Sequence, residues 1–283
     1  MPFLGAIVVP HPPLILPQVG RGGERQIAQT AEAYRRAAAF IVAAAPDTVI
    51  LTTPHSILYQ DYFHLSPRES AAGDMARFGA PQVRLEVAYD AELTRAVSRR
   101  ALSEGFPAGT QGQRDAALDH ASLVPLQFIK EAAGGHLPFR LVRAGLSGLS
   151  FAMHAQLGRM LAEEAESLHR RWCFVASGDL SHYLKKSGPY GFRPEGLAYD
   201  NRIMEVLGRG AFDELLAMDD AACERAGECG HRSFCIMAGA LEGLPVRATA
   251  LSYQDVTGVG YGVCTFEPLD STSAMAQGKE TEA

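Results

Sequence analysis

Two histidines of this sequence follow apolar runs and are each preceded by a proline. The run that starts at Ile7 leads into Pro-His-Pro-Pro, which contains His11. The run that starts at Val49 leads into Pro-His, which contains His55. Each proline fixes its own φ angle and keeps the preceding residue extended, so these histidines have a defined direction. A single histidine at a strand end is most often structural, but the same arrangement after two separate runs favours a pair of metal ligands.

Three further segments carry side chains that bind metals or transfer protons. "GDLSH" ends in His182 after an apolar run, "LDHAS" places His120 just ahead of an expected helix, and "GECG" places Glu228 at an expected helix start. Each segment also has a simple structural explanation, because Asp179 or Asp119 could cap a helix and Glu228 could interact with a helix dipole. Four histidines and a glutamate that converge on one face could together form a metal site.

The chemistry of this set is that of a non-haem iron centre. Two neutral imidazoles and one carboxylate form the facial triad of Fe(II) sites, which leaves positions open for a substrate and O₂. Two more histidines nearby would supply acid–base catalysis near neutral pH. The sequence contains no HExxH or HxxEH zinc motif and no Gly-rich phosphate-binding fingerprint. The inventory therefore indicates oxygen chemistry on a chelating substrate.

The elements that must position these side chains form an alternating pattern. Nearly all-apolar runs that start at Phe3, Thr48 and Trp172 are typical of strands covered on both faces. Residues 25–45 lack Gly and Pro and predict a long helix. Further helices are expected at residues 91–104, 122–133, 151–170, 200–207, 212–218 and 230–241, and further strands at residues 83–89, 139–144, 246–254 and 260–268. Strands alternating with helices favour an α/β fold with functional side chains at the strand ends.

The remaining stretches predict loops and one domain. The turn-rich residues 68–80 and 187–196 are expected to be surface loops, long enough to form lids or walls of a substrate site. We see no internal repeat and no linker, so a single domain is expected over residues 1–270. Residues 271–283 are small and polar, and we expect them to form a disordered tail.

Composition limits the partners. The 283 residues are 47% hydrophobic and 20% charged, and the net charge of −6 with scattered Lys and Arg argues against binding to nucleic acid or to an anionic membrane surface. No apolar run reaches the roughly 20 residues of a membrane span, and the N-terminus does not read as a signal peptide. The five cysteines form no CxxC pair. We therefore expect a cytoplasmic protein with reduced thiols and no membrane partner.

The motifs, taken in order, resemble one known family. "PHPPL", "PHS", "LDHASLVPL", "SGDLSH" and "GECG" resemble the class III extradiol ring-cleavage dioxygenases, in particular their catalytic LigB-type subunit. The resemblance covers roughly residues 3–268 and is closest to a stand-alone bacterial branch related to the Memo proteins. It implies a single-domain α/β fold with a central mixed β-sheet flanked by helices and a metal site at the C-terminal ends of strands.

The resemblance also implies a role for each residue. His11 and His55 would be the imidazole ligands and Glu228 the carboxylate ligand of Fe(II) or another divalent metal. His182 would be the general acid–base, and His120 would hydrogen-bond substrate or oxygen. A catecholic or related aromatic substrate would chelate the metal, and its ring would be opened with both atoms of O₂. Family members often self-associate, so a homodimer is expected, although no sequence feature fixes it.

Two alternatives to ring cleavage stay open. In Memo proteins a cysteine occupies the region of the third ligand, and Cys229 lies beside Glu228. Adjacent residues at a helix start project about 100° apart, so only one of them readily faces the metal. A carboxylate suits Fe(II), whereas a thiolate would select copper or zinc and indicate a Memo-like redox protein. The other alternative is a non-enzymatic interaction module, against which the presence of all five candidate residues argues.

Overall fold

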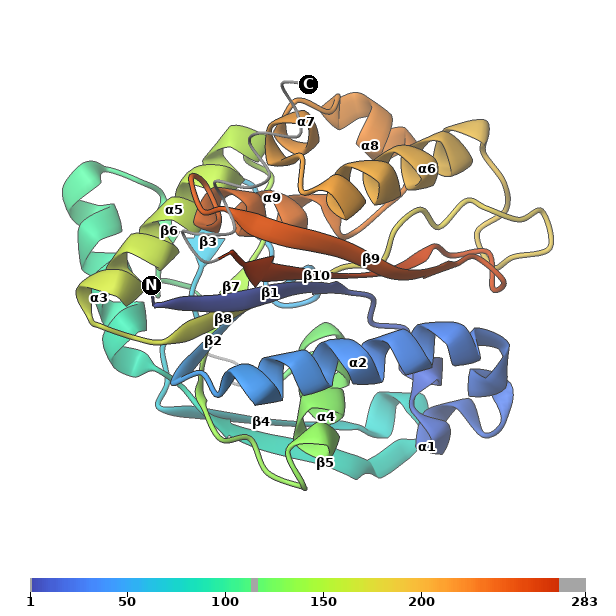
Figure 1. The fold of residues 1–283 in the computed structure, drawn as a ribbon, viewed down its shortest axis with the longest axis horizontal. Coiled ribbons are helices and arrows are strands. Elements are labelled where there is room, and N and C mark those ends of the chain that lie inside the picture. Colours follow the sequence, from blue (N-terminus) through green and yellow to red (C-terminus); the bar gives the residue numbers. More distant parts are fainter. Residues whose placement is uncertain (1, 113–116, 270–283) are drawn as a thin grey trace.

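A mixed six-stranded sheet runs through the centre of the computed structural model, which describes residues 2–112 and 117–269 (Figure 1). The strand order is β7-β2-β8-β1-β10-β9. The parallel strands are β7 (Arg140–Gly145), β2 (Thr48–Thr53), β8 (Trp172–Ser177) and β1 (Phe3–Val9), and the antiparallel edge consists of β10 (Tyr261–Pro268) and β9 (Val246–Gln254). The expected α/β class with a central mixed sheet is confirmed.

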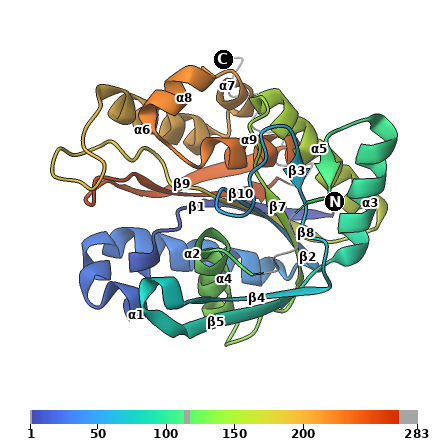
Figure 2. The same ribbon diagram turned by 180° about the vertical axis from the view of Figure 1, so that it is seen from behind.

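Layers of other elements cover both faces of the sheet, which explains why its parallel strands are apolar on both sides. Ile7 and Val9 of β1 pack into one layer, and Ala6 and Val8 pack into the other. One layer contains α2 (Ala28–Ala44), α4 (His120–Ala132) and the hairpin of β4 (Ser70–Met75) and β5 (Ala80–Ala88) (Figures 1 and 2). The other contains α3 (Ala91–Glu104), α5 (Phe151–Ser167), α6 (Pro194–Arg209) and α9 (His231–Ala240).

Short elements connect these layers. They are η1 (Pro13–Ile15), α1 (Pro17–Gly20), η2 (Gly23–Ile27), β3 (Phe63–His64), η3 (Ala76–Phe78), β6 (Ala108–Gly109), α7 (Phe212–Leu216) and α8 (Asp220–Ala226). The helix α8 has no counterpart in the sequence prediction, and α6 begins at Pro194 rather than at residue 200. The other expected helices and strands are present, with ends displaced by a few residues.

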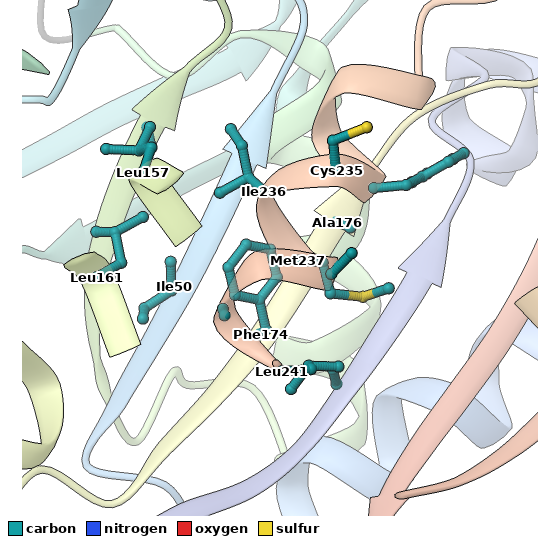
Figure 3. Packing of buried hydrophobic residues seen from close by; sticks show 14 of the residues in the cluster. Ile50, Leu157, Leu161, Phe174, Ala176, Cys235, Ile236, Met237 and Leu241 are labelled. Carbon is teal, nitrogen blue, oxygen red and sulfur yellow. The ribbon is translucent and has the colours of Figure 1, made fainter. Parts of the chain in front are cut away.

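Helix α9 is held close to α5 and to the sheet. Figure 3 shows Phe174 of β8 beside Met237 of α9 in the buried core. Gly158 of α5 and Gly239 of α9 lie where the helices touch, and a Cβ atom on either residue would come within 1.9 Å of a carbonyl oxygen of the other helix. Only glycine permits this approach. The tight packing gives a fixed place to the segment that precedes α9, residues 227–230.

The prediction of a surface loop at residues 68–80 was wrong. Most of this stretch forms β4 and η3, and β4 pairs with β5 in an antiparallel register that places Asp74 opposite Arg84. Within β4 only Ala71 and Met75 are buried. The strand is therefore built from small and polar residues and has none of the β-branched or aromatic residues that usually indicate one.

The sheet and its two layers form one domain within the described residues. The tail expected at residues 271–283 lies outside them. Among the described helices none has the length and apolar character that crossing a membrane requires.

Candidate metal centre

Three histidines converge at the edge where the parallel strands end. His11 follows β1, His55 follows β2 and His120 opens α4. Each offers one nitrogen, and these three atoms lie within 4.8 Å of one another. The Nε2 atoms of His11 and His55 are 3.1 Å apart. Because β2, β8 and β1 are parallel neighbours, their carboxyl ends meet at one edge, and the two Pro-His segments are brought together there.

The spacing and charge of these imidazoles suit a shared cation. The Nε2 atoms of His11 and His55, 3.1 Å apart, are close enough for one cation to contact both. Burial lowers the pKa of His11, and the neighbouring His55, His120 and His182 lower it further. Burial also lowers the pKa of His55, against a smaller opposing effect of Asp119. Both rings are therefore neutral, which is the form that binds metals.

The third imidazole, His120, is placed by a capped helix start. Asp119 is the N-cap of α4 and accepts hydrogen bonds from the backbone N–H of Ser122 at 3.0 Å and from the Thr53 hydroxyl at 2.7 Å. The His120 ring stacks on His55 with a centroid separation of 4.3 Å. Burial and the nearby His55 lower the pKa of His120 to about 4. His120 thus contributes a second neutral ring beside His55.

The fourth histidine, His182, lies next to this cluster with its tautomer defined. Its Nδ1 atom is 2.6 Å from the carbonyl oxygen of Gly227, and because a carbonyl only accepts, Nδ1 carries the proton. The Nε2 atom is left with a lone pair. Burial lowers the pKa of His182, so the ring is neutral. A neutral ring with a free Nε2 lone pair is able to accept a proton.

Glu228 and Cys229 point in different directions. The Cys229 sulfur lies 3.6 Å from Nε2 of His11. The Glu228 carboxylate accepts a hydrogen bond from the backbone N–H of His231, at the start of its own helix. Among the described residues neither Glu228 nor Cys229 belongs to the group of mutually close ligand atoms, which contains His11, His55 and His120. The structure therefore brings the thiol, rather than the expected carboxylate, to His11.

Burial governs the protonation of both side chains. It raises the pKa of Glu228 to about 7, and the backbone N–H of His231 partly opposes this rise. It also raises the pKa of the Cys229 thiol, with further contributions from the negative charges of Asp179 and Glu228. A bound cation would offset this cost, because a thiol that coordinates a metal is deprotonated.

A buried carboxylate that the sequence suggested only as a helix cap also touches His11. Asp179 accepts a hydrogen bond from the His11 backbone N–H at 2.7 Å, and its second oxygen lies 3.9 Å from His11 Nε2. Burial raises the pKa of Asp179 to about 7. The signal for its role was its position two residues after β8, the strand between β1 and β2.

An open cavity of about 1170 Å³ begins at His55 and His120 and extends over the β4–β5 hairpin. Phe78 of the hairpin contacts the edge of the His120 ring at a centroid distance of 5.2 Å. Arg77 and Arg84 lie further along the same wall. Cavities that hold small organic molecules measure about 300–1,000 Å³, so this one is large enough for such a substrate.

Comparisons with known proteins agree with these observations. Residues 5–264 match the family model described as the catalytic LigB subunit of aromatic ring-opening dioxygenase. A curated relative, protein CA_C1420 of Clostridium acetobutylicum, is 33% identical over 281 residues, which cover 97% of this chain and 59% of the relative. The chain thus spans less than two thirds of that relative's length.

A solved structure supports the fold. The crystal structure of the uncharacterized protein JW3007 from Escherichia coli K12 matches with a TM-score of 0.53 and 14% sequence identity. The match covers 93% of this chain and 99% of the other.

Proposed function

Because the chain belongs to the family of catalytic LigB subunits of aromatic ring-opening dioxygenases, we propose that it is a metal-dependent oxidoreductase whose metal is held by His11, His55 and Cys229. The family resemblance drawn from the motifs is confirmed by this match. One observation carries the proposal: Nε2 of His11 lies 3.1 Å from Nε2 of His55 and 3.6 Å from the Cys229 sulfur. The Cys229 sulfur thus lies beside His11, whereas the third atom of the group that converges with His11 and His55 is a nitrogen of His120.

The donor set favours a soft metal. Two imidazoles with a thiolate suit copper or zinc, whereas Fe(II) in a facial triad takes a carboxylate as its third protein ligand. The orientation of Cys229 thus supports the Memo-like form of this function, a metal-binding redox protein. A bound copper ion would supply one-electron redox chemistry at this edge of the sheet.

The residues around the proposed metal site would bind the substrate, accept a proton from it and exclude water. The His182 lone pair accepts a proton from an acidic group of the substrate, since its Nδ1 proton is committed to the Gly227 carbonyl. His120, stacked on His55 at the mouth of the cavity, offers a hydrogen bond to the bound molecule. The hairpin wall with Phe78 covers His120 and limits the access of water to it.

A second candidate function is the Fe(II)-dependent ring opening of a catecholic substrate with O₂. The family description and the cavity that His120 lines favour it. It requires a carboxylate ligand, which would be Glu228 after rotation toward the histidines, or Asp179, already 3.9 Å from His11 Nε2. His182 would then deprotonate the catechol, and His120 would hydrogen-bond it.

The metal content of variants separates these candidates. Wild type, Glu228→Gln and Cys229→Ser would be purified without oxygen and analysed for bound metals, with Cys264→Ser as the control for loss of a buried thiol in β10. Oxygen uptake would be recorded with a panel of catechols. Metal lost in Cys229→Ser and kept in Glu228→Gln supports the thiolate site.

The opposite pattern favours ring opening. Iron lost only in Glu228→Gln, together with catechol-dependent oxygen uptake by wild type, would overturn the assignment of Cys229. A wild-type protein that binds no divalent or monovalent metal ion above background would overturn both candidates.

A further inference from the structure

We propose that Ser177 is a positioning residue that fixes His11 in the tautomer needed for metal binding, and that Pro125 of α4 makes this possible. The inference rests on the proposed function, because it concerns a ligand of that site. Ser177 is the last residue of β8 and is fully buried. Its hydroxyl oxygen lies 3.1 Å from Nδ1 of His11 and 2.7 Å from the carbonyl oxygen of Ala121.

The hydroxyl of Ser177 has one proton and two neighbours. A carbonyl oxygen only accepts, so the Ser177 proton goes to Ala121. The hydroxyl oxygen must then accept from His11, whose Nδ1 atom therefore carries the ring proton. Nε2 of His11 is left as a bare lone pair, and this is the atom that faces His55 and Cys229. Outer partners of metal-binding histidines commonly set the ring tautomer in this way.

Proline explains why the Ala121 carbonyl is available. In an α-helix this oxygen would accept from the backbone N–H four residues later, which is position 125. Pro125 lies inside α4 and has no N–H, so the Ala121 carbonyl lacks its helical partner. Ser177 supplies the missing donor. The proline of "LDHASLVPL" thus directs the Ser177 proton away from His11 and leaves a lone pair for it.

The alternative tautomer of His11 would place a proton on the nitrogen that is proposed to bind the metal. A proton on Nε2 of His11 would point at Nε2 of His55, 3.1 Å away, and the two rings would satisfy each other by a hydrogen bond. A metal would then have to displace that proton before His11 could bind. The bond to Ser177 removes the state in which His11 is the donor of that hydrogen bond. It also ties β8 to the first turn of α4, which carries His120.

The test measures the tautomer and metal affinity separately. In chelator-treated protein labelled with ¹⁵N-histidine, NMR would report which His11 nitrogen is protonated, with His11→Gln used to assign the signals. Wild type is expected to be protonated at Nδ1, and Ser177→Ala is expected to shift toward protonation at Nε2. The dissociation constant for Cu(I) or Zn(II), measured by competition with a chelator, is expected to rise by about 10–100-fold in Ser177→Ala.

Two further variants complete the design. Pro125→Ala restores a backbone N–H that competes for the Ala121 carbonyl, so it should weaken metal binding in the same direction while leaving Ser177 in place. Ser233→Ala is the matched control, because Ser233 is equally buried and bonds the Thr52 hydroxyl rather than a histidine. It should change neither the tautomer nor the affinity.

The outcomes distinguish this inference from the proposed function. If wild type binds metal and Ser177→Ala binds it equally well with His11 still protonated at Nδ1, the role of Ser177 is refuted while the metal site stands. If wild type binds no metal, the proposed function fails, and the NMR result on chelator-treated protein still decides whether Ser177 sets the tautomer.

Discussion

The two ends of strand β2 carry polar clusters that accommodate buried polar groups in opposite ways. At its start, Thr48 donates a hydrogen bond to the buried Asp90 at 2.6 Å, and Arg170 pairs with the same carboxylate at 2.9 Å. Just beyond its end, His55 faces His11 and His120, and the three ligand atoms lie within 4.8 Å of one another. The first cluster pairs a charge with its counter-charge, whereas the second gathers groups of the same kind.

The pKa shifts express this difference. Burial alone would raise the pKa of Asp90, but the hydrogen bonds from Arg170 and Thr48 lower it overall, so the carboxylate is held ionised. Burial lowers the pKa of each imidazole at the other end, and the neighbouring rings lower it further for His11 and His120. The first cluster is complete in itself. The second presents lone pairs that only a cation or a proton donor can satisfy, which is why we assign function to it.

The largest expected effect is the loss of metal binding when a histidine beyond the end of β2 is replaced. His11→Ala and His55→Ala should each weaken metal binding by more than about 100-fold, since even the outer partners of ligands cost 10–100-fold. His136→Ala, a change at an exposed histidine outside the cluster, should leave metal content unchanged. Elemental analysis after chelator competition provides the measurement. Full metal content in both His11→Ala and His55→Ala would show that the cluster beyond the end of β2 does not bind the metal.

Removing the ion pair at the start of β2 should lower stability and leave metal binding unchanged. Arg170→Ala leaves Asp90 buried without its counter-charge and should lower the free energy of unfolding by about 3 kcal/mol. This value is near the low end of the range for breaking a buried ion pair, because the Arg170 side chain is 23% exposed. Urea denaturation gives this value. Metal content of the folded variant should equal that of wild type, and a parallel loss of metal would show that the two ends are not independent.

Acid should remove that stability difference. The folded-state pKa of Asp90 is lowered below its ordinary value of about 3.9, so its contribution to stability is complete above that pH and is lost as the pH falls through the folded-state pKa. Wild type and Arg170→Ala should therefore differ most near neutral pH and converge below about pH 4. Urea denaturation at a series of pH values tests this, and a gap that widens on acidification would contradict it.

The smallest expected effect is a change in the pKa of His120 when the neighbouring Phe78 is replaced. Phe78→Ala uncovers His120, so the pKa of His120 should rise from about 4 toward the ordinary histidine value of about 6.5, because burial is the main cause of its depression. NMR titration of chelator-treated protein follows this change. Phe78 is 38% exposed, so stability should change by no more than about 1 kcal/mol. An unchanged His120 pKa would mean that Phe78 does not shield it.

Much of the fold and part of the site could be read from the sequence because they depend on local patterns. The apolar runs predicted the parallel strands, since strands buried on both faces need continuous apolar residues. The prolines predicted that His11 and His55 have fixed directions at strand ends. The hairpin strand β4 could not be recognised, because its small and polar residues pack through only Ala71 and Met75.

The choice between Glu228 and Cys229 belongs to the tertiary structure. Gly227 adopts a left-handed φ of 65° before this pair, and Gly230 after it packs so closely on Gly178 that a Cβ on Gly178 would lie 2.2 Å from the Gly230 Cα atom. Gly227 ends α8 in the left-handed conformation, which a glycine at a helix end signals locally. The contact of Gly230 with Gly178 leaves no local signal, because it depends on a distant part of the chain. Together they orient the segment whose thiol lies beside His11.

The sequence by itself determined which chemical groups the protein has and that strand ends would present several of them. Only the tertiary structure decided that Cys229 and Asp179 face His11, that Ser177 holds its ring and that the cavity wall expected from residues 68–80 is a β-hairpin rather than a loop. The physical reason is that local patterns specify secondary structure and burial. The distances between side chains more than a hundred residues apart follow from how the helices and the sheet pack.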